Sequence, residues 1–195
     1  MPISIIPSQL TLGRSARPFN GIRTALLLTL LGVMGLVLVM SQAYAESIPG
    51  PDKSFLNSAA EAGNAELKAS KLALEKSNNP DVKTFASLMV DEHTTLRDDL
   101  KKLAASKDVS VPDDASMTQR AKIAVLEKLH GTMFDKQYVG MIGVSAHKDA
   151  VKLFSKAATD AKDPDVKDFA VKSLPSLQHH LALAQSLKAK LDDQK

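Results

Sequence analysis

The sequence predicts an all-α protein, a four-helix bundle built from two repeated αα-hairpins that are joined by a long crossover containing a short helix. Apolar residues recur at alternating spacings of four and three along four long segments, which is the period of a helix with one buried face. A turn sequence of the form Pro-Asp-Val-Lys occurs twice. The chain contains no cysteine, so packing rather than disulfide bonds must hold this fold together.

The first 45 residues have the features of a secretory signal peptide. Arg14, Arg17 and Arg23 form a basic region without acidic residues, Ala25–Met40 is almost entirely apolar, and an Ala-x-Ala pattern ends at Ala45. We expect cleavage after Ala45 and export to the periplasm or another part of the cell envelope. The alternative is an uncleaved membrane anchor, because about 17–20 apolar residues can span a bilayer.

The rest of the chain is predicted to be a short leader, residues 46–52, and one domain, residues 53–195. The full chain holds 25 Lys and Arg residues and 22 Asp and Glu residues. Three arginines and no acidic residue lie in the first 45 positions, so the mature part holds 22 of each kind. This balance argues against a nucleic-acid partner. The sequence identifies no protein partner, and contact with a membrane is expected only if the signal segment is retained.

Prolines and glycines divide the domain into helical segments. Pro80 and Pro164 are at first-turn positions, where a missing amide proton costs nothing. Pro112 lies in a break before the short helix, and Gly131 is expected to end that helix. The predicted helices are approximately Lys53–Ser77, Pro80–Ser106, Met117–His130, Thr132–Ala161 and Pro164–Asp192.

Two stretches of the sequence are near copies of each other. Residues 79–86 (NPDVKTFA) match residues 163–170 (DPDVKDFA). Each stretch lies at the turn between two long helices, so the two αα-hairpins resemble copies of one unit. The connection between them, of about 25 residues, is long enough to run the length of the bundle, as the single crossover of ferritin-like bundles does.

Each long helix places one ionisable residue in its apolar stripe. These residues are Glu66, His93, His147 and His180, in chain order. Because the stripe of a bundle helix faces the interior, we predict that all four side chains are buried. His179 falls on a different face from its neighbour and is expected to be exposed.

The four residues are also predicted to lie at a similar height in the bundle. From the first turn, near position 79, Glu66 lies 13 residues back and His93 lies 14 forward. From the second turn, near position 163, His147 lies 16 residues back and His180 lies 17 forward. At about 1.5 Å per residue, each pair is level within its hairpin and the two hairpins differ by only about 5 Å.

A buried carboxylate among three histidines needs compensation, because an ionised carboxylate in an apolar core costs several kcal/mol. One divalent transition metal would supply it, since imidazoles and a carboxylate suit Zn, Fe, Mn or Cu. We therefore take Glu66, His93, His147 and His180 as candidate ligands of a single metal. The alternative is a metal-free hydrogen-bond network among the same side chains, which would also satisfy their polar groups.

Other signatures argue against a di-iron enzyme. Such sites need Glu-x-x-His on two helices, but the residue three positions before His93 is Val90 and the one before His180 is Leu177. Glu92 adjoins His93 but is predicted to point away from the stripe. There is no glycine-rich phosphate loop and no Ser/His/Asp pattern. We predict no catalytic residue, and the question of enzyme activity stays open.

Three segments carry a resemblance to a known family. They are Met89–Ala104 (MVDEHTTLRDDLKKLA), Phe134–Phe154 (FDKQYVGMIGVSAHKDAVKLF) and Ser173–Ala184 (SLPSLQHHLALA). Over about residues 53–190 the sequence resembles an exported, ferritin-like bacterial family catalogued as domain of unknown function 4142. The resemblance implies a ferritin-like bundle and an envelope location, but no settled activity.

By motif position, His93, His147 and His180 match histidines that recur in that family, and Glu66 matches an acidic position in its first helix. Relatives often carry a second acidic residue two positions later, where this chain has Lys68. The resemblance therefore supports the same four residues but leaves a second metal without that ligand.

Two functional hypotheses follow. The first is a periplasmic metal-binding bundle for storage, buffering or simple redox chemistry. The second is a non-enzymatic envelope or stress-response protein, structural or interacting with other proteins, whose buried Glu/His network holds no metal. A chelator should lower the thermal stability of the first kind of protein and leave the second unchanged.

Overall fold

The computed structural model describes residues 48–193, and every regular element in that range is a helix, which confirms the all-α prediction. The predicted signal peptide lies outside the described residues. None of the helices within residues 48–193 is long and apolar enough to cross a membrane. The helices are α2 (Gly50–Lys76), α3 (Pro80–Ser106), α4 (Met117–Glu127), α5 (Gly131–Tyr138), η1 (Val139–Ala146), α6 (His147–Asp160) and α7 (Pro164–Asp193).

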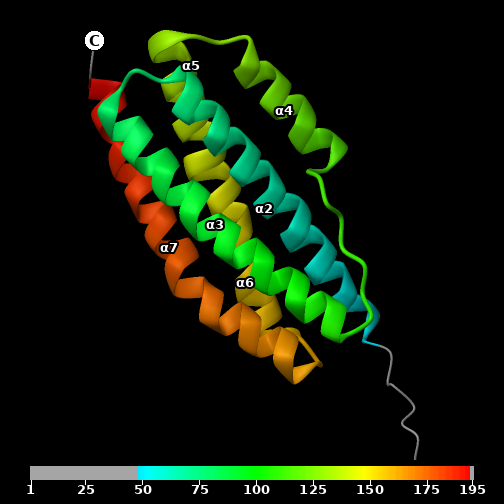
Figure 1. Ribbon diagram of the computed structural model, residues 1–195. Helices are drawn as coiled ribbons and strands as arrows, with labels where there is room; N and C mark the ends of the chain where they lie inside the picture. The colour runs from blue at the N-terminus through cyan, green and yellow to red at the C-terminus, as the bar shows by residue number, and fades with distance from the viewer. Residues whose placement is uncertain (1–47, 194–195) are drawn as a thin grey trace, which may run out of the picture. The chain divides into compact units, whose positions relative to one another are not determined.

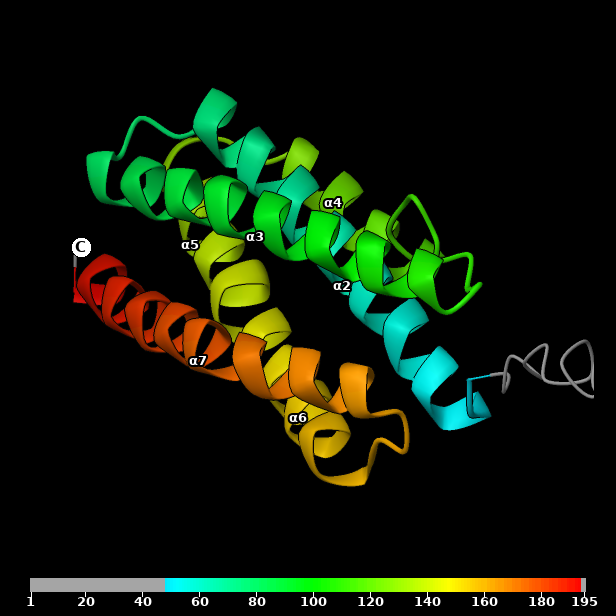
Figure 2. The same cartoon turned by 60° about the horizontal axis from the view of Figure 1, so that its bottom comes forward.

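Four long helical rods lie side by side, and α5, η1 and α6 together form the third rod (Figure 1). The most extensive helix–helix contacts are those of α2 with α3 and of α6 with α7, which are the two predicted hairpins. Figure 2 shows the pair α2–α3 as one layer and the pair α6–α7 as the other. The short helix α4 belongs to the crossover and packs on the outside of α2.

The repeated turn sequence builds the same helix start twice. Asn79 precedes α3, and its Oδ1 accepts hydrogen bonds from the backbone amides two and three residues further on, at 2.9 and 3.3 Å. Asp163 precedes α7 and caps it in the same way, at 2.9 and 3.1 Å. Pro80 and Pro164 follow these caps and fill the first helical positions, as the sequence predicts.

The first helix begins earlier than predicted, at Gly50 instead of Lys53. Asp52, in its first turn, is buried, and its Oδ2 accepts hydrogen bonds from the backbone amides of Lys162 at 2.9 Å and Asp163 at 2.7 Å. This carboxylate ties the start of α2 to the turn between α6 and α7. Residues 50–52 of the predicted leader thus belong to α2, and this helix start is held by a contact more than 100 positions away in the chain.

The third rod also differs from its prediction. The sequence predicts one α-helix over Thr132–Ala161, whereas the structure places the π-helix η1 between α5 and α6. A π-helix has wider turns than an α-helix, so it changes the face on which later residues lie. Gly143 lies in η1, and a Cβ atom added there would stand 3.0 Å from the Cβ of Ala184. Its lack of a side chain therefore permits a close approach of this rod to α7.

Gly131 marks a different boundary from the one predicted. The short helix α4 ends at Glu127, and Gly131 is the first residue of α5. Its φ of 56° lies in the left-handed region, which glycine adopts without steric cost. The glycine thus allows the chain to change direction into the third rod.

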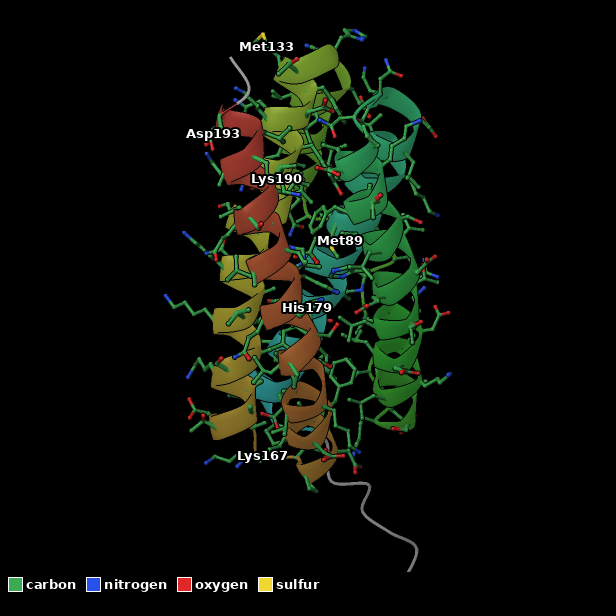
Figure 3. The ribbon with its side chains drawn as sticks, turned by 90° about the vertical axis from the view of Figure 1, so that its left-hand side faces the viewer. Met89, Met133, Lys167, His179, Lys190 and Asp193 are labelled. Carbon is green, nitrogen blue, oxygen red and sulfur yellow. The ribbon has the colours of Figure 1, made fainter. Side chains whose placement is uncertain are left out.

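Two apolar clusters fill the bundle on either side of a polar layer, which is made of Glu66, His93, His147 and His180. Met89 and Tyr138 belong to one cluster, and Leu100 and Phe154 belong to the other. Along α3, His93 lies between Met89 and Leu100, so it falls at the boundary between the clusters. Figure 3 labels Met89, which is completely buried, among the side chains between α3 and α7.

Candidate metal centre

The structure brings the four predicted side chains together near the middle of the bundle. Glu66 comes from α2, His93 from α3, His147 from the start of α6 and His180 from α7. None of them is more than 2% exposed. The centroids of the three imidazole rings are 5.2–5.3 Å apart in every pair. Their predicted burial and common height are therefore confirmed.

The three histidines bring ring nitrogens close to one another. One nitrogen from each ring lies within 4.8 Å of the other two, and Nε2 of His93 is 3.3 Å from Nε2 of His147. Two nitrogens bound to one tetrahedral zinc ion at about 2.0–2.1 Å would lie about 3.3–3.4 Å apart. This pair thus has the spacing of metal-bound nitrogens, which is also close to that of a hydrogen bond.

The ring of His147 is oriented by the π-helix that precedes it. Its Nδ1–H donates a hydrogen bond to the carbonyl oxygen of Ile142, in η1, at 3.0 Å. The backbone N–H of His147 donates to a different carbonyl, that of Val144. The hydrogen bond from Nδ1 selects the ring tautomer in which Nε2 keeps a free lone pair, and this Nε2 faces His93.

Glu66 lies against the Nδ1 edges of two rings. Its Oε2 is 3.2 Å from Nδ1 of His93, and its Oε1 is 3.7 Å from Nδ1 of His147. The shorter contact has the length of a hydrogen bond, but its atoms are poorly aligned, so Nδ1 of His93 has no hydrogen-bond partner. The carboxylate therefore stands behind the ring of His93, at the edge remote from its Nε2 atom.

A second carboxylate, that of Glu92, contacts the cluster, and the prediction that it points away from the stripe is wrong. Its Oε2 accepts a hydrogen bond from Nε2 of His180 at 2.8 Å and another from the hydroxyl of Ser176. The hydrogen bond from Ser176 is the largest of several effects that lower the pKa of Glu92. Because this contact depends on how α3 packs against α7, the periodicity of a single helix carries no signal for it.

The family described as "Domain of unknown function (DUF4142)" matches residues 38–187. The chain belongs to this family. The resemblance found in the three sequence segments is thereby confirmed. No curated protein matches the chain.

Solved structures share the fold of this DUF4142 chain at low sequence identity. A DUF305 fragment from Deinococcus radiodurans has a TM-score of 0.65 and 14% identity, covering 73% of this chain and 98% of its own. A protein described as a putative secreted protein DUF305, from Streptomyces coelicolor, has a TM-score of 0.61 and 15% identity, covering 73% and 94%. A conserved hypothetical protein from Mycobacterium tuberculosis has a TM-score of 0.57 and 16% identity, covering 71% and 91%.

Burial favours the neutral forms of the ionisable groups in the DUF4142 cluster. It raises the pKa of Glu66, and the nearby His147 opposes this effect. It lowers the pKa of His93 well below the usual value of 6.5, and the other two histidines add to this shift. It also lowers the pKa of His180, although Glu92 acts in the opposite direction. His93 and His180 are therefore neutral at pH 7, the form in which imidazole binds metals.

Polar atoms without partners are concentrated in this cluster. Within the described residues, five buried side-chain atoms lack an aligned hydrogen-bond partner, and three of them are Oε1 of Glu66, Nδ1 of His93 and Nδ1 of His180. Buried polar groups in native proteins are nearly always paired with protein, water or an ion. Of these atoms, Oε1 of Glu66 and Nδ1 of His180 offer lone pairs that an additional bound species would satisfy.

The neighbour of His180 provides a useful contrast. His179 is exposed, as the sequence predicts, and Figure 3 labels it on α7. The two residues have the same side chain and lie on the same helix, but only His180 belongs to the cluster, so His179 can serve as a control in mutagenesis.

Proposed function

We propose that this DUF4142 protein binds one divalent transition metal in the bundle core through His93, His147 and His180. The observation that carries this proposal is the convergence of three buried imidazoles from three helices, each with a ring nitrogen within 4.8 Å of the other two. Exposed histidines meet by chance on many surfaces, but three in a dry core displace apolar contacts and need a compensating interaction. A shared metal supplies that interaction.

Oxygen atoms behind the rings support the same proposal. Metal-bound histidines typically donate their second N–H to a carboxylate or a carbonyl, which orients the ring and makes the ligating nitrogen more basic. Each histidine of the cluster has such an oxygen close to one ring nitrogen. The oxygens are those of Glu66 for His93, the backbone carbonyl of Ile142 for His147, and Glu92 for His180.

Glu66 takes a supporting role in this proposal instead of the direct ligation expected from the sequence. Its Oε2 is 3.2 Å from Nδ1 of His93, so it is placed to accept that N–H and to leave Nε2 for the metal. An ionised Glu66 would also balance part of the charge of the ion. Direct ligation by Glu66 would require this carboxylate to pass to the Nε2 edge of the ring.

Three nitrogen donors favour Zn, Cu or Fe over Mn, which prefers oxygen ligands. The small exposure of every ligand favours retention of the ion over turnover of a large substrate, because no organic molecule can reach the three nitrogens directly. We therefore propose metal storage or buffering, and we assign no catalytic residue.

A metal-free network is the second candidate, and one chain of contacts favours it. A protonated Glu66 would donate to Nδ1 of His93, and Nε2–H of His93 would donate to Nε2 of His147. The Nδ1–H of His147 in turn donates to the carbonyl oxygen of Ile142. The raised pKa of Glu66 agrees with its protonated form. In this arrangement the cluster is a structural polar layer of an envelope or stress-response protein.

Elemental mass spectrometry on protein purified without an affinity tag distinguishes the two candidates. We expect about one metal per chain, because the three nitrogens can serve only one ion. The His93→Ala, His147→Ala double variant and His180→Ala should both lose the metal. His179→Ala is the matched control and should retain it, since this side chain is exposed on the same helix.

Thermal unfolding with and without a chelator provides the second readout. A metal that binds only the folded state raises the unfolding temperature, so removing it should lower that temperature in the wild type and in His179→Ala. Protein that takes up no metal after incubation with Zn, Fe, Mn and Cu would overturn the metal proposal and leave the polar network.

We also propose that the protein is exported and that residues 1–45 are removed. The basic and apolar parts of this segment and its Ala-x-Ala end support this location, as does the structural similarity to a protein described as secreted. The intact mass of protein isolated from the envelope fraction tests the proposal. A chain beginning at Glu46 would support cleavage, and a mass that retains the segment would indicate a membrane anchor.

A further inference from the structure

A cavity of about 290 Å³ lies between α2, α4 and the third rod. Its walls are mainly apolar and include Ala62, Ile142 and Leu153. The short helix α4 contributes Lys122, which is exposed, so the cavity reaches the protein surface. Glu66 also contributes to the lining. The cavity therefore connects the surface to the edge of the histidine cluster.

The charges that line this cavity favour a cation. Glu61, which is partly exposed, and Asp149, which is exposed, belong to the lining, and Lys122 is its single cationic residue. Glu66 adds a third carboxyl group at the buried end. A hollow with one sign of charge in excess and low-dielectric walls concentrates ions of the opposite sign.

The buried end of the cavity offers an oxygen without a partner. Oε1 of Glu66 makes no hydrogen bond, although the residue is only 2% exposed. A much smaller void of about 10 Å³ is lined by both Glu66 and His93, and a space of about this size holds one water molecule. Ala62 lines both the cavity and the void. The two spaces thus have Ala62, Glu66 and Ala150 in common in their walls, and the smaller one also borders His93.

We infer that this cavity is the path by which a hydrated divalent cation reaches the three histidines, and that the free Oε1 atom of Glu66 is the first buried group it contacts on the way. The inference rests on the proposed metal site and adds how that site is filled. The cavity has room for an ion with several of its waters. The carboxylate at the buried end then replaces some of those waters before the imidazoles take the ion.

The α7 side of the cluster is bordered by Glu92, whose side chain is 41% exposed, and by Ser176. Glu92 and Ser176 are hydrogen-bonded to each other and both contact Nε2 of His180. Another cavity of about 340 Å³ lies between α3 and α7, but Leu88 and Leu187 line it and none of the four cluster residues does. The lining of that cavity therefore does not include the histidine cluster.

Rates of metal uptake test the path separately from the site. Metal-free mature protein is mixed with Co²⁺ in a stopped-flow instrument, and the visible absorption of the bound ion is followed. Ala62→Phe narrows both spaces, because Ala62 lines each of them, and should slow uptake about tenfold or more, because a close-packed interior passes an ion only when it opens locally. Ser186→Phe is the matched control, since it fills the other cavity, and it should leave the rate unchanged.

Charge variants on the surface provide a test that does not depend on packing. Lys122→Glu should speed Co²⁺ uptake, and Glu61→Lys should slow it, each by about threefold or more at low salt. Both effects should shrink as salt is added, because the charges are screened. All variants should still bind about one Co²⁺ per chain at equilibrium.

The outcomes separate the inference from the proposal on which it rests. Normal stoichiometry with uptake rates equal to the wild type in Ala62→Phe and in both charge variants would overturn the path and leave the site intact. Slower uptake in Ser186→Phe alone would place the path between α3 and α7, and would also overturn the inference. Absence of Co²⁺ binding in the wild type would overturn the metal site itself.

Discussion

At the scale of single residues, Glu92 provides a sharp test because the chain offers a matched neighbour. Glu92→Gln keeps an oxygen that can accept a hydrogen bond from Nε2 of His180 but removes the negative charge. We expect a metal affinity about tenfold lower, the usual cost of losing a carboxylate behind a metal-bound histidine. Asp91→Asn removes the same charge from an exposed position and should leave the affinity unchanged. Competition with a chelator of known affinity measures both, and equal affinities for the two variants would remove Glu92 from the site.

Single-residue features also mark the limit of prediction from the sequence. The positions of Glu66, His93, His147 and His180 could be predicted, because each interrupts an apolar stripe and the hairpin turns set their heights. The edge of the His93 ring that Glu66 contacts could not be predicted, since it depends on the side-chain rotamers of residues on two helices at once. Glu92 was missed for a similar reason: its contact with Ser176 exists only because α3 and α7 are packed together.

At the scale of helices, the close contact between the π-helix η1 and α7 can be tested by substituting the glycines of η1. Alanine stabilises a helix relative to glycine by about 1 kcal/mol, so Gly140→Ala should be neutral or stabilising, because no atom lies within 4 Å of its added Cβ. At Gly143 the new Cβ would stand 3.0 Å from Ala184 and 3.4 Å from Phe85. Overpacking of this kind costs about 1–3 kcal/mol.

Gly143→Ala should therefore be less stable than Gly140→Ala by about 1–3 kcal/mol, which is the cost of overpacking, because the gain in helix propensity is common to both variants. Urea unfolding of the two variants measures the difference directly. Equal stabilities would mean that α7 yields to the extra methyl group, and that η1 does not need a glycine at this position.

The helices themselves show which boundaries a sequence can determine. Prolines and capping side chains fixed the starts of α3 and α7 to the residue, because these signals act within a few positions. The start of α2 was missed by three residues, since it is held by the buried contact of Asp52 with the turn before α7. The π-helix was missed because the apolar spacing around Val139–Ala146 is compatible with either kind of turn.

At the scale of the whole molecule, the polar layer makes the stability of the metal-free protein depend on pH. Burial lowers the pKa values of His93 and His180 in the folded state, so below about pH 6.5 the unfolded chain binds protons that the folded protein excludes, and stability falls. Burial raises the pKa of Glu66, which has the opposite effect between about pH 4.5 and its pKa in the folded protein. Because two histidines destabilise the folded protein on acidification and one glutamate stabilises it, the histidines should determine whether stability rises or falls.

We therefore expect the free energy of unfolding of chelator-treated protein to decrease on acidification from pH 7 to pH 5, by at most about 1.4 kcal/mol per pH unit, the value for one net proton. Urea unfolding at several pH values measures this slope. His93→Leu should reduce the slope, because it removes one of the two groups, whereas His179→Leu should not, because His179 is exposed. If the metal-free protein became more stable on acidification, protonation of Glu66 would outweigh the effect of the two histidines. That result is expected if the carboxyl proton of Glu66 links a metal-free hydrogen-bond network.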